Sequence, residues 1–342
     1  MADLVSPGVQ IKEKDLTTTV TSPPGSIGGV SIIASEGYAD TIVTVGSEEE
    51  LVEQFGKPSA TNYEYWFSAA NFLGYTNNLK VIRALQTGML NSTGASGGLL
   101  IPNTLSYQVG DGTNGPYSGG EATSKGSWAA RSPGAWGNSL QVSACTSTDA
   151  YYKAAKTTTT GALTEGDTTV DVASVTDILV GSIISIDGDT AGSLYKVTAI
   201  ASLELTIVRY PTQVATGIVA ASIVNTSNVN LFWEWYAEFD GPPTTSQYAT
   251  DHSATLDEMH IVVVDEDGDI SGVKETVLER YDSVSKASDA LTDEGAANYY
   301  VDVLYSNSAY IYWLDHPAGG SNWGTSVTTK NAYDTATAPV DT

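Results

Sequence analysis

The sequence predicts a mixed α/β protein with more than one compact unit and an all-β segment within it. Three observations support this fold class. Strand, helix, helix and strand patterns follow one another over residues 30–85, as in an α/β core. Over residues 157–225 short alternating strands follow one another without a helical pattern. An apolar run at 258–264 and an alternating run at 273–279 then predict a hairpin.

The α/β pattern begins with two short strands and a helix with clear end signals. The strands are expected at residues 30–34 and 41–45. Ser47 can cap a helix, and Glu50 three positions later gives the spacing of a capping box. Gly56, followed by a proline, ends this helix.

A second helix is expected over residues 62–73, and a strand over 79–85. The apolar side chains of this helix recur at helical spacing; they are Tyr63, Trp66, Phe67, Ala70 and Leu73. Such a stripe is far more often part of a core than of a cofactor site. We therefore expect it to pack inside the protein.

Residues 157–225, which show no helical pattern, predict a small antiparallel β-barrel or sandwich, because at least four short strands occur there at near-regular spacing. This segment separates two differently patterned parts of the chain, as an inserted domain would. After it, further elements are expected as an aromatic strand at 230–236, the hairpin, a helix at 296–304 and a strand at 309–314. From Pro317 onward the sequence is polar and unpatterned.

The charge of the chain is strongly acidic. Its 342 residues carry a net charge of −25, with only 15 Lys and Arg and no basic cluster. This argues against binding to nucleic acid or to an anionic membrane. Because like charges repel, a close-packed assembly of such chains needs apolar or backbone contacts, or screening by salt.

Cysteine usage and the N-terminus indicate a cytoplasm-like compartment. Cys145 is the single cysteine, so the chain cannot form an internal disulfide, and we interpret it as a small apolar strand residue. The first residues lack the basic and apolar regions of a secretory signal. No apolar run approaches the roughly 20 residues that span a bilayer.

The usual signatures of catalysis and of cofactor or metal binding are missing from the sequence. Phosphate-binding glycine loops, nucleophile motifs and zinc spacings do not occur, and the three histidines lie far apart. The acidic run from Asp265 to Asp269 resembles a calcium loop, but Lys274 occupies the position of the required distal glutamate. We expect a solvated hairpin turn there, and no enzyme activity, cofactor or metal.

The first 22 residues predict an extended arm. Pro7 and Gly8 exclude a helix, the following residues alternate, and no partner strand lies within hairpin distance. Such a strand can form an edge of the protein's own sheet or add to a sheet of another chain. The local sequence supports both alternatives equally. The candidate residues for pairing are Gly8, Val9, Gln10, Ile11, Leu16 and Val20.

Three pieces of sequence resemble the N-terminal part of tail sheath proteins of contractile-tailed bacteriophages. They are Ser6-Pro-Gly-Val9 and the runs 46–58 and 69–83, and their order and spacing agree with that family. Residues 136–138, the acidic hairpin turn and the helix start at 298–302 also look like sheath elements. The resemblance covers residues 1–142 and 228–315. The segment between them looks like a β-module of the kind added to phage structural proteins.

The resemblance implies a sheath-type α/β core that is interrupted by the β-module. The expected divisions are an arm at 1–22, the first part of the core at 23–150, an inserted all-β module at 157–226, the second part of the core at 227–316, and a polar tail or the start of a missing C-terminal domain at 317–342.

The function implied by the resemblance is mechanical. Sheath subunits stack as hexameric rings around the tail tube and contract after the baseplate is triggered, driving the tube through the host envelope. The partners would be other copies of the chain, tube proteins and baseplate proteins. The protein would be located in the virion tail, after assembly in the host cytoplasm. The alternative is a surface-exposed binding or decoration protein of a virion, similar to an adhesin, that uses its β-module.

Overall fold

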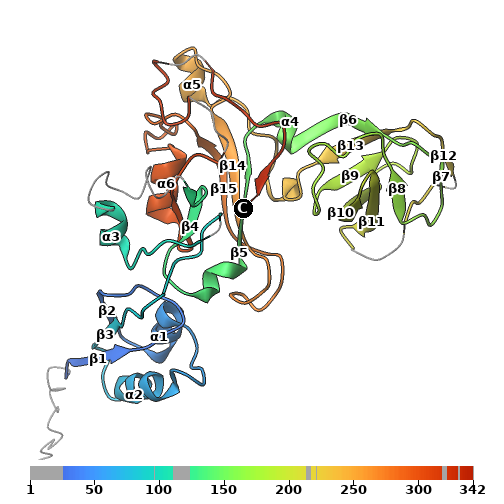
Figure 1. The fold of residues 1–342 in the computed structure, drawn as a ribbon. Coiled ribbons are helices and arrows are strands. Elements are labelled where there is room, and N and C mark those ends of the chain that lie inside the picture. The colour runs from blue at the N-terminus through green and yellow to red at the C-terminus, as the bar shows by residue number, and fades with distance from the viewer. Residues whose placement is uncertain are drawn as a thin grey trace, which may run out of the picture. The chain divides into compact units, whose positions relative to one another are not determined.

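The computed structural model describes residues 26–95, 97–110, 124–212, 217–220, 222–317, 322–329 and 332–341. They divide into two compact units. Unit 1 is formed by residues 26–34 and 40–84, and unit 2 by residues 35–39 together with the described residues from 85 onward. Several small sheets with short helices beside them confirm the predicted mixed α/β class (Figure 1).

Unit 1 is a three-stranded sheet with two helices. Its elements are β1 (Gly28–Ile32), β2 (Ile42–Val45), α1 (Glu48–Phe55), α2 (Tyr63–Leu73) and β3 (Leu79–Arg83). The middle strand is β3, which runs parallel to β1 and antiparallel to β2. The predicted succession of strands and helices is confirmed for this part of the chain.

The ends of α1 are set by its own sequence. The Ser47 side chain accepts a hydrogen bond of 3.1 Å from the amide of Glu50, and the Glu50 carboxylate accepts one of 2.7 Å from the amide of Gly46. At the other end Gly56 has φ of 78°, a left-handed conformation that glycine adopts without steric cost. The predicted start and stop signals of this helix are confirmed.

The core of unit 1 lies on one face of the sheet. Ile32, Val45 and Val81, one from each strand, pack in a single cluster with buried side chains of both helices. On the opposite face Ile42 and Ile82 lie directly across from each other in the β2–β3 ladder, and both are exposed. Because side chains alternate along a strand, the two helices cover only half of the sheet surface.

Unit 2 contains the remaining elements. Its helices are α3 (Thr104–Val109), α4 (Thr148–Tyr151), α5 (Gln247–Asp251) and α6 (Tyr300–Asn307), with 3-10 segments at Ala135–Ser139 and Tyr236–Glu238. Its strands are β4 (Trp128–Ala130), β5 (Leu140–Cys145), β6 (Tyr152–Thr158), β7 (Leu163–Thr164), β8 (Thr169–Asp171), β9 (Ile183–Ile186), β10 (Leu194–Ala201), β11 (Glu204–Tyr210), β12 (Ser222–Ile223), β13 (Asn228–Phe232), β14 (Glu258–Asp265), β15 (Thr276–Ser285), β16 (Ile311–Trp313) and β17 (Val340–Asp341).

A four-stranded sheet in the order β15-β14-β5-β17 forms the centre of unit 2. Every β14 residue after Glu258 is buried, which confirms the predicted buried strand and its hairpin with β15. One face of this sheet packs against α6 through Tyr300 and Leu304. The other face packs against Trp233 and Phe239. A strand covered on both faces needs apolar residues at nearly every position, as β14 has.

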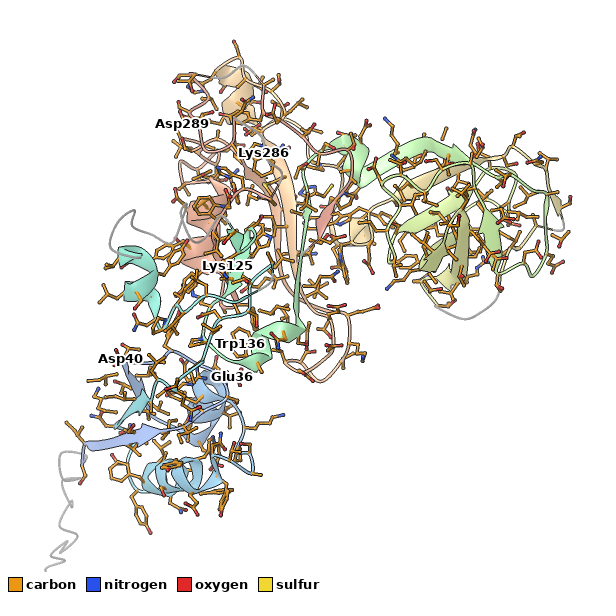
Figure 2. The ribbon with its side chains drawn as sticks, viewed as in Figure 1. Glu36, Asp40, Lys125, Trp136, Lys286 and Asp289 are labelled. Atoms are coloured by element: carbon orange, nitrogen blue, oxygen red, sulfur yellow. The ribbon has the colours of Figure 1, made fainter. Side chains whose placement is uncertain are left out.

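The described residues after Pro317 also pack against unit 2. Trp323, Val327 and Tyr333 are buried. Asp289, labelled in Figure 2, accepts a hydrogen bond of 2.9 Å from the amide of Val327. At the end of this segment β17 pairs with β5. Hydrogen bonds and scattered apolar side chains hold this segment, so its sequence shows no regular pattern.

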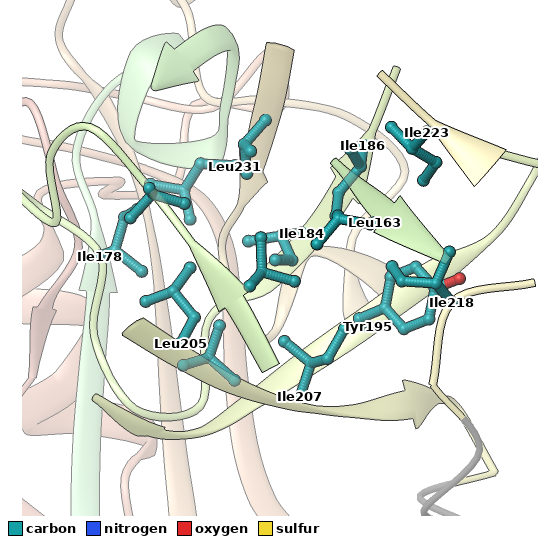
Figure 3. Packing of buried hydrophobic residues seen from close by; sticks show 14 residues of the cluster. Leu163, Ile178, Ile184, Ile186, Tyr195, Leu205, Ile207, Ile218, Ile223 and Leu231 are labelled. Carbon is teal, nitrogen blue, oxygen red and sulfur yellow. The ribbon is translucent and has the colours of Figure 1, made fainter. Parts of the chain in front are cut away.

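The strands from β6 to β13 form a separate β-structure within unit 2. Six of them make an antiparallel sheet in the order β6-β13-β9-β10-β11-β8, and β7 pairs with β12. They surround one core that includes Ile184, Tyr195 and Leu205 (Figure 3). The sheet does not close into a barrel. Its edge strands β6 and β8 are not paired as a ladder. The residues that follow each of them form an isolated antiparallel bridge between Thr159 and Val172, with backbone bonds such as Thr160 N–H to Asp171 O.

The aromatic strand predicted over residues 230–236 ends earlier, because Phe232 is the last residue of β13. Trp233 turns inward, and its indole Nε1 donates a hydrogen bond of 2.8 Å to the Ser143 hydroxyl. The chain then forms the 3-10 turn at Tyr236–Glu238. The long-range bond to Ser143 and the burial of Trp233 replace further strand pairing here.

Among the described residues, no helix is both long enough and apolar enough to cross a membrane.

Candidate assembly surface

The residues predicted to pair with a neighbouring chain lie outside the described residues. They are Gly8, Val9, Gln10, Ile11, Leu16 and Val20. The structure begins at Ser26, two residues before β1. β1, the first strand after the predicted arm in the sequence, is an edge strand of the unit 1 sheet.

The start of β1 is fixed by the turn that follows α2. The Thr76 hydroxyl donates a hydrogen bond of 3.0 Å to the carbonyl of Ser26, and the Gly28 amide donates one of 3.1 Å to the carbonyl of Asn78. Ile27 and Tyr75 are the chain neighbours of Ser26 and Thr76. Their exposed fractions are 68% and 92%. No sequence pattern indicated the exposure of either residue, because exposure depends on the tertiary structure.

The aromatic stripe of α2 is only partly buried, so the expectation that it packs inside the protein is wrong for two of its members. Trp66 is buried, and its indole Nε1 donates a hydrogen bond of 3.0 Å to the carbonyl of Gly56. Tyr63 and Phe67 are each 50% exposed. They lie four residues apart and therefore on one flank of the helix. The Phe67 ring packs edge-on against Trp66, with 5.2 Å between the ring centroids. The small sheet is too narrow to cover the whole apolar face.

The acidic turn between β14 and β15 is built around Asp265, which is buried rather than solvated as expected. Its carboxylate accepts hydrogen bonds from the hydroxyls of Ser139 and Ser271, at 2.6 and 2.7 Å, and from the amides of Gly268, Ile270 and Ser271. Burial acts to raise the pKa of Asp265, but these donors lower it below its ordinary value. Both oxygens are occupied by the protein's own donors, which opposes a calcium loop.

His260 and Cys145 occupy structural positions. His260 is buried, with Nε2 2.9 Å from the Gly241 carbonyl and Nδ1 accepting a hydrogen bond of 3.0 Å from the Ser283 amide. Burial lowers the pKa of His260, which favours the neutral ring. Burial raises the pKa of Cys145 to about 12, so its thiol is protonated at neutral pH. Within the described ranges, no three His, Cys, Asp or Glu residues are placed to hold a metal ion.

Lys286 is a buried cation that the sequence analysis did not single out. It is 0% exposed, and its Nζ donates hydrogen bonds of 2.8 Å to the carbonyls of Thr146 and Leu256. Nζ also lies 5.3 Å from the centroid of the Trp323 ring, within the range of a cation–π contact. Burial lowers the pKa of Lys286 to about 8, although the charge of Asp257 opposes this. Lys286 thus connects three segments of unit 2.

A second lysine connects the β-structure to the central sheet. Lys196 of β10 forms ion pairs with Glu234 at 2.9 Å and with Glu275 at 2.8 Å. Burial acts to lower the pKa of Lys196, but the two carboxylates raise it above its ordinary value. Glu234 follows β13 and Glu275 precedes β15, so one ammonium group links three strands.

Three curated proteins align with this chain. The tail sheath protein of Enterobacteria phage T4 is 34% identical over 113 residues, which are 32% of this chain and 17% of that protein. The tail sheath protein of Salmonella phage ViI is 27% identical over 331 residues, 90% of this chain and 49% of that protein. The tail sheath protein of Vibrio phage KVP40 is 30% identical over 122 residues, 35% and 17% of the two chains.

The sequence resembles bacteriophage tail sheath proteins. The resemblance predicted from three short pieces is thereby confirmed and extends over most of the chain. The chain spans about half the length of the tail sheath protein of phage ViI. No protein-family model matches it.

Proposed function

We propose that this chain is a structural subunit of a contractile phage tail sheath. It polymerises as stacked hexameric rings around the tail tube and contracts to drive the tube through the host envelope. The similarity to the sheath protein of phage ViI over 331 residues carries this proposal. All three relatives are named tail sheath proteins, which favours this role over a surface-binding decoration protein.

The N-terminal arm links neighbouring subunits in this proposal. Backbone groups of residues 8–19 pair with the sheet edge of another copy, and the side chains of Val9 and Ile11 dock beside it. The arm is followed immediately by the compact unit 1, so it can reach a neighbour while its root is held at Ser26 and Gly28. Strand addition of this kind keeps subunits connected while their bodies move.

The β-module at residues 157–226 is an insertion into the sheath core and lies on the outer surface of the assembly. Two observations support the insertion. Tyr152 and Phe232 are directly paired across β6 and β13, so the chain enters and leaves the β-structure at one place. The core strands β5 and β14 pair with each other across the insertion. In this proposal the parts at 23–150 and 227–316 belong to the sheath core, and the segment 317–342 follows them.

The partners of the chain are other copies of itself, the tail tube and the baseplate. It acts in the virion tail after assembly in the host cytoplasm. The mechanical energy resides in the contacts between subunits, so the proposal includes no catalytic step, cofactor or metal. The acidic charge of −25 agrees with a partner set that excludes nucleic acid and membrane lipid.

The arm can be tested by removing its backbone donors. The double variant Val9→Pro with Gln10→Pro lacks the amide N–H on both edges of the arm, because neighbouring residues of a strand point in opposite directions. The matched control is Val9→Thr with Gln10→Thr, which keeps both amides. Negative-stain electron microscopy and sedimentation velocity of the whole chain measure assembly.

We expect tubes or rings from the wild type and from the threonine control, and unassembled protein from the proline variant and from a chain lacking residues 1–20. Normal assembly of the proline variant would exclude strand addition by this arm. A wild-type chain that stays monomeric at every concentration would contradict the sheath function for this chain.

A further inference from the structure

The β-structure formed by β6 to β13 has a core of its own. The buried side chains of that core all lie between Leu163 and Leu231 (Figure 3). Among the described residues, the two clusters that cover the faces of the central sheet take no side chain from this range. Bodies with separate cores change their relative position readily unless a large apolar interface joins them. The contacts between the β-structure and the central sheet therefore decide whether it is held in one position.

The chain enters and leaves the β-structure at a neck of two paired residues, Tyr152 of β6 and Phe232 of β13 (Figure 1). Directly beyond the neck, Tyr151 and Trp233 are buried in the cluster beside the central sheet. On the other side, Phe232 is paired with Ile183 of β9, so β13 belongs to the β-structure as far as its last residue. Backbone rotation at the two ends of the neck would turn the β-structure as one body.

An ion-pair cluster beside the neck connects the β-structure to the central sheet. Lys196 is paired with Ile183, which is paired with Phe232, so Lys196 lies two strands, or about 10 Å, from the neck. Its Nζ is 2.8 Å from Oε2 of Glu275, which precedes β15, and 2.9 Å from Oε1 of Glu234, which follows β13. Only 10% of the Lys196 side chain is exposed, so salt screens these contacts less than those of a surface pair.

The charges on both sides of this cluster oppose docking. Residues 152–232 contain seven Asp and Glu against four Lys and Arg, and the rest of the chain is more acidic still. Glu234 and Glu275 both lie within 3 Å of the same Nζ, so without the ammonium group the two carboxylates repel each other. Lys196 converts this repulsion into attraction at the point where the two bodies meet.

We propose that the β-structure is hinged at the neck, and that Lys196 with Glu234 and Glu275 is a latch that holds it against the central sheet. With the latch closed, the β-structure and the central sheet move together. With the latch open, the β-structure turns about the neck while its own core stays intact. This motion takes place within one chain and does not depend on the sheath function.

Double electron–electron resonance measures the motion as a distance distribution between two spin labels. One label is placed on the β-structure at Val224→Cys, which is 71% exposed, and the other on α6 at Asp302→Cys. Cys145 is buried, so it does not compete for the label. Labelled chains are diluted into unlabelled wild type, so that distances between different chains do not contribute.

The latch is broken from each side. Lys196→Met removes the ammonium group, and Glu275→Lys places a second cation beside Lys196 without changing the β-structure. The matched control is Lys156→Met, which makes the same charge change in a lysine that is 16% exposed and whose ion-pair partner, Asp177, lies inside the β-structure. Hydrogen exchange of the β9 and β11 amides verifies that the core of the β-structure stays folded.

We expect a single narrow distance distribution for the wild type and for Lys156→Met. Both latch variants should lose that narrow peak and show a broader distribution that extends to longer distances, because repulsion between carboxylates or between cations replaces the latch. The protection of the β9 and β11 amides should not change in any variant.

A narrow, unchanged distribution in Lys196→Met and Glu275→Lys would overturn the latch, and so would a broad distribution in the wild type. If Lys196→Met lowers the protection of β9 and β11, the result for Glu275→Lys decides alone, since that variant leaves every residue of the β-structure in place.

Discussion

The ring of Phe72 lies directly against the α-carbon of Gly28. A Cβ atom on Gly28 would come within 2.3 Å of Phe72 Cε1 and 2.4 Å of Cζ. This close approach lets α2 pack against the edge strand β1. The position of α2 therefore depends on the missing side chain at residue 28.

Gly28→Ala should therefore destabilise unit 1 by about 1–3 kcal/mol, because the added methyl group forces Phe72 and α2 to move. Gly29→Ala is the matched control, since a Cβ there meets nothing within 4 Å. Hydrogen exchange of the α2 amides, followed by mass spectrometry, measures the local stability. Equal exchange in the two variants would contradict the packing described.

Asp265→Asn should reduce the free energy of unfolding by about 2–3 kcal/mol, because an amide replaces a charged acceptor that faces several donors. Asp267→Asn is the control. Its side chain is mostly exposed and forms a 3.6 Å ion pair with Lys274, an arrangement worth at most about 1 kcal/mol. Urea unfolding followed by tryptophan fluorescence compares the variants.

The lowered pKa of Asp265 also makes the difference in free energy of unfolding between the wild type and Asp265→Asn depend on pH. Since folding lowers the pKa, the charged carboxylate stabilises the fold at neutral pH, and this contribution is lost as the pH falls through the lowered value. The difference between wild type and Asp265→Asn should shrink in acid. A difference that does not change with pH would exclude a stabilising carboxylate. Addition of calcium should leave the unfolding midpoint of the wild type unchanged.

Lys286 gives a pH dependence of the same sign, but in the alkaline range and because burial disfavours the charged form. Folding lowers its pKa from 10.5 to about 8. Between these pH values the unfolded chain keeps the proton and the folded chain releases it, so the free energy of unfolding rises with pH. Relative to Lys286→Met, the wild type should gain up to about 3 kcal/mol between pH 7 and pH 10.5. Urea unfolding at both pH values tests this, and a constant difference would indicate an ordinary lysine.

Self-association of the chain should increase with salt. A net charge of −25 makes copies repel one another, and the screening length falls from about 10 Å at 0.1 M salt to about 3 Å at 1 M. Sedimentation velocity in 0.1 and 1 M sodium chloride measures the effect. Contacts between opposite charges would be weakened by salt instead, so dissociation at high salt would contradict an assembly held by apolar and backbone contacts.

The sequence by itself determined the elements whose signals are local. The capping residues Ser47 and Glu50 and the terminating Gly56 define α1 within ten residues of chain. The apolar run of β14 and the turn after it predict the hairpin with β15. The resemblance to tail sheath proteins was likewise present in short pieces of sequence, because it depends on residue order and not on packing.

Only the tertiary structure decided which apolar and charged side chains are buried. Tyr63 and Phe67 belong to the same apolar stripe as Trp66, but the narrow sheet of unit 1 covers only Trp66. Lys286 and Asp265 have the sequence character of surface residues. Lys286 is nevertheless enclosed by acceptors from distant segments, and Asp265 by Ser139 together with donors of its own turn. Helical and strand periods describe neighbours along the chain, whereas burial depends on what the rest of the fold places above each residue.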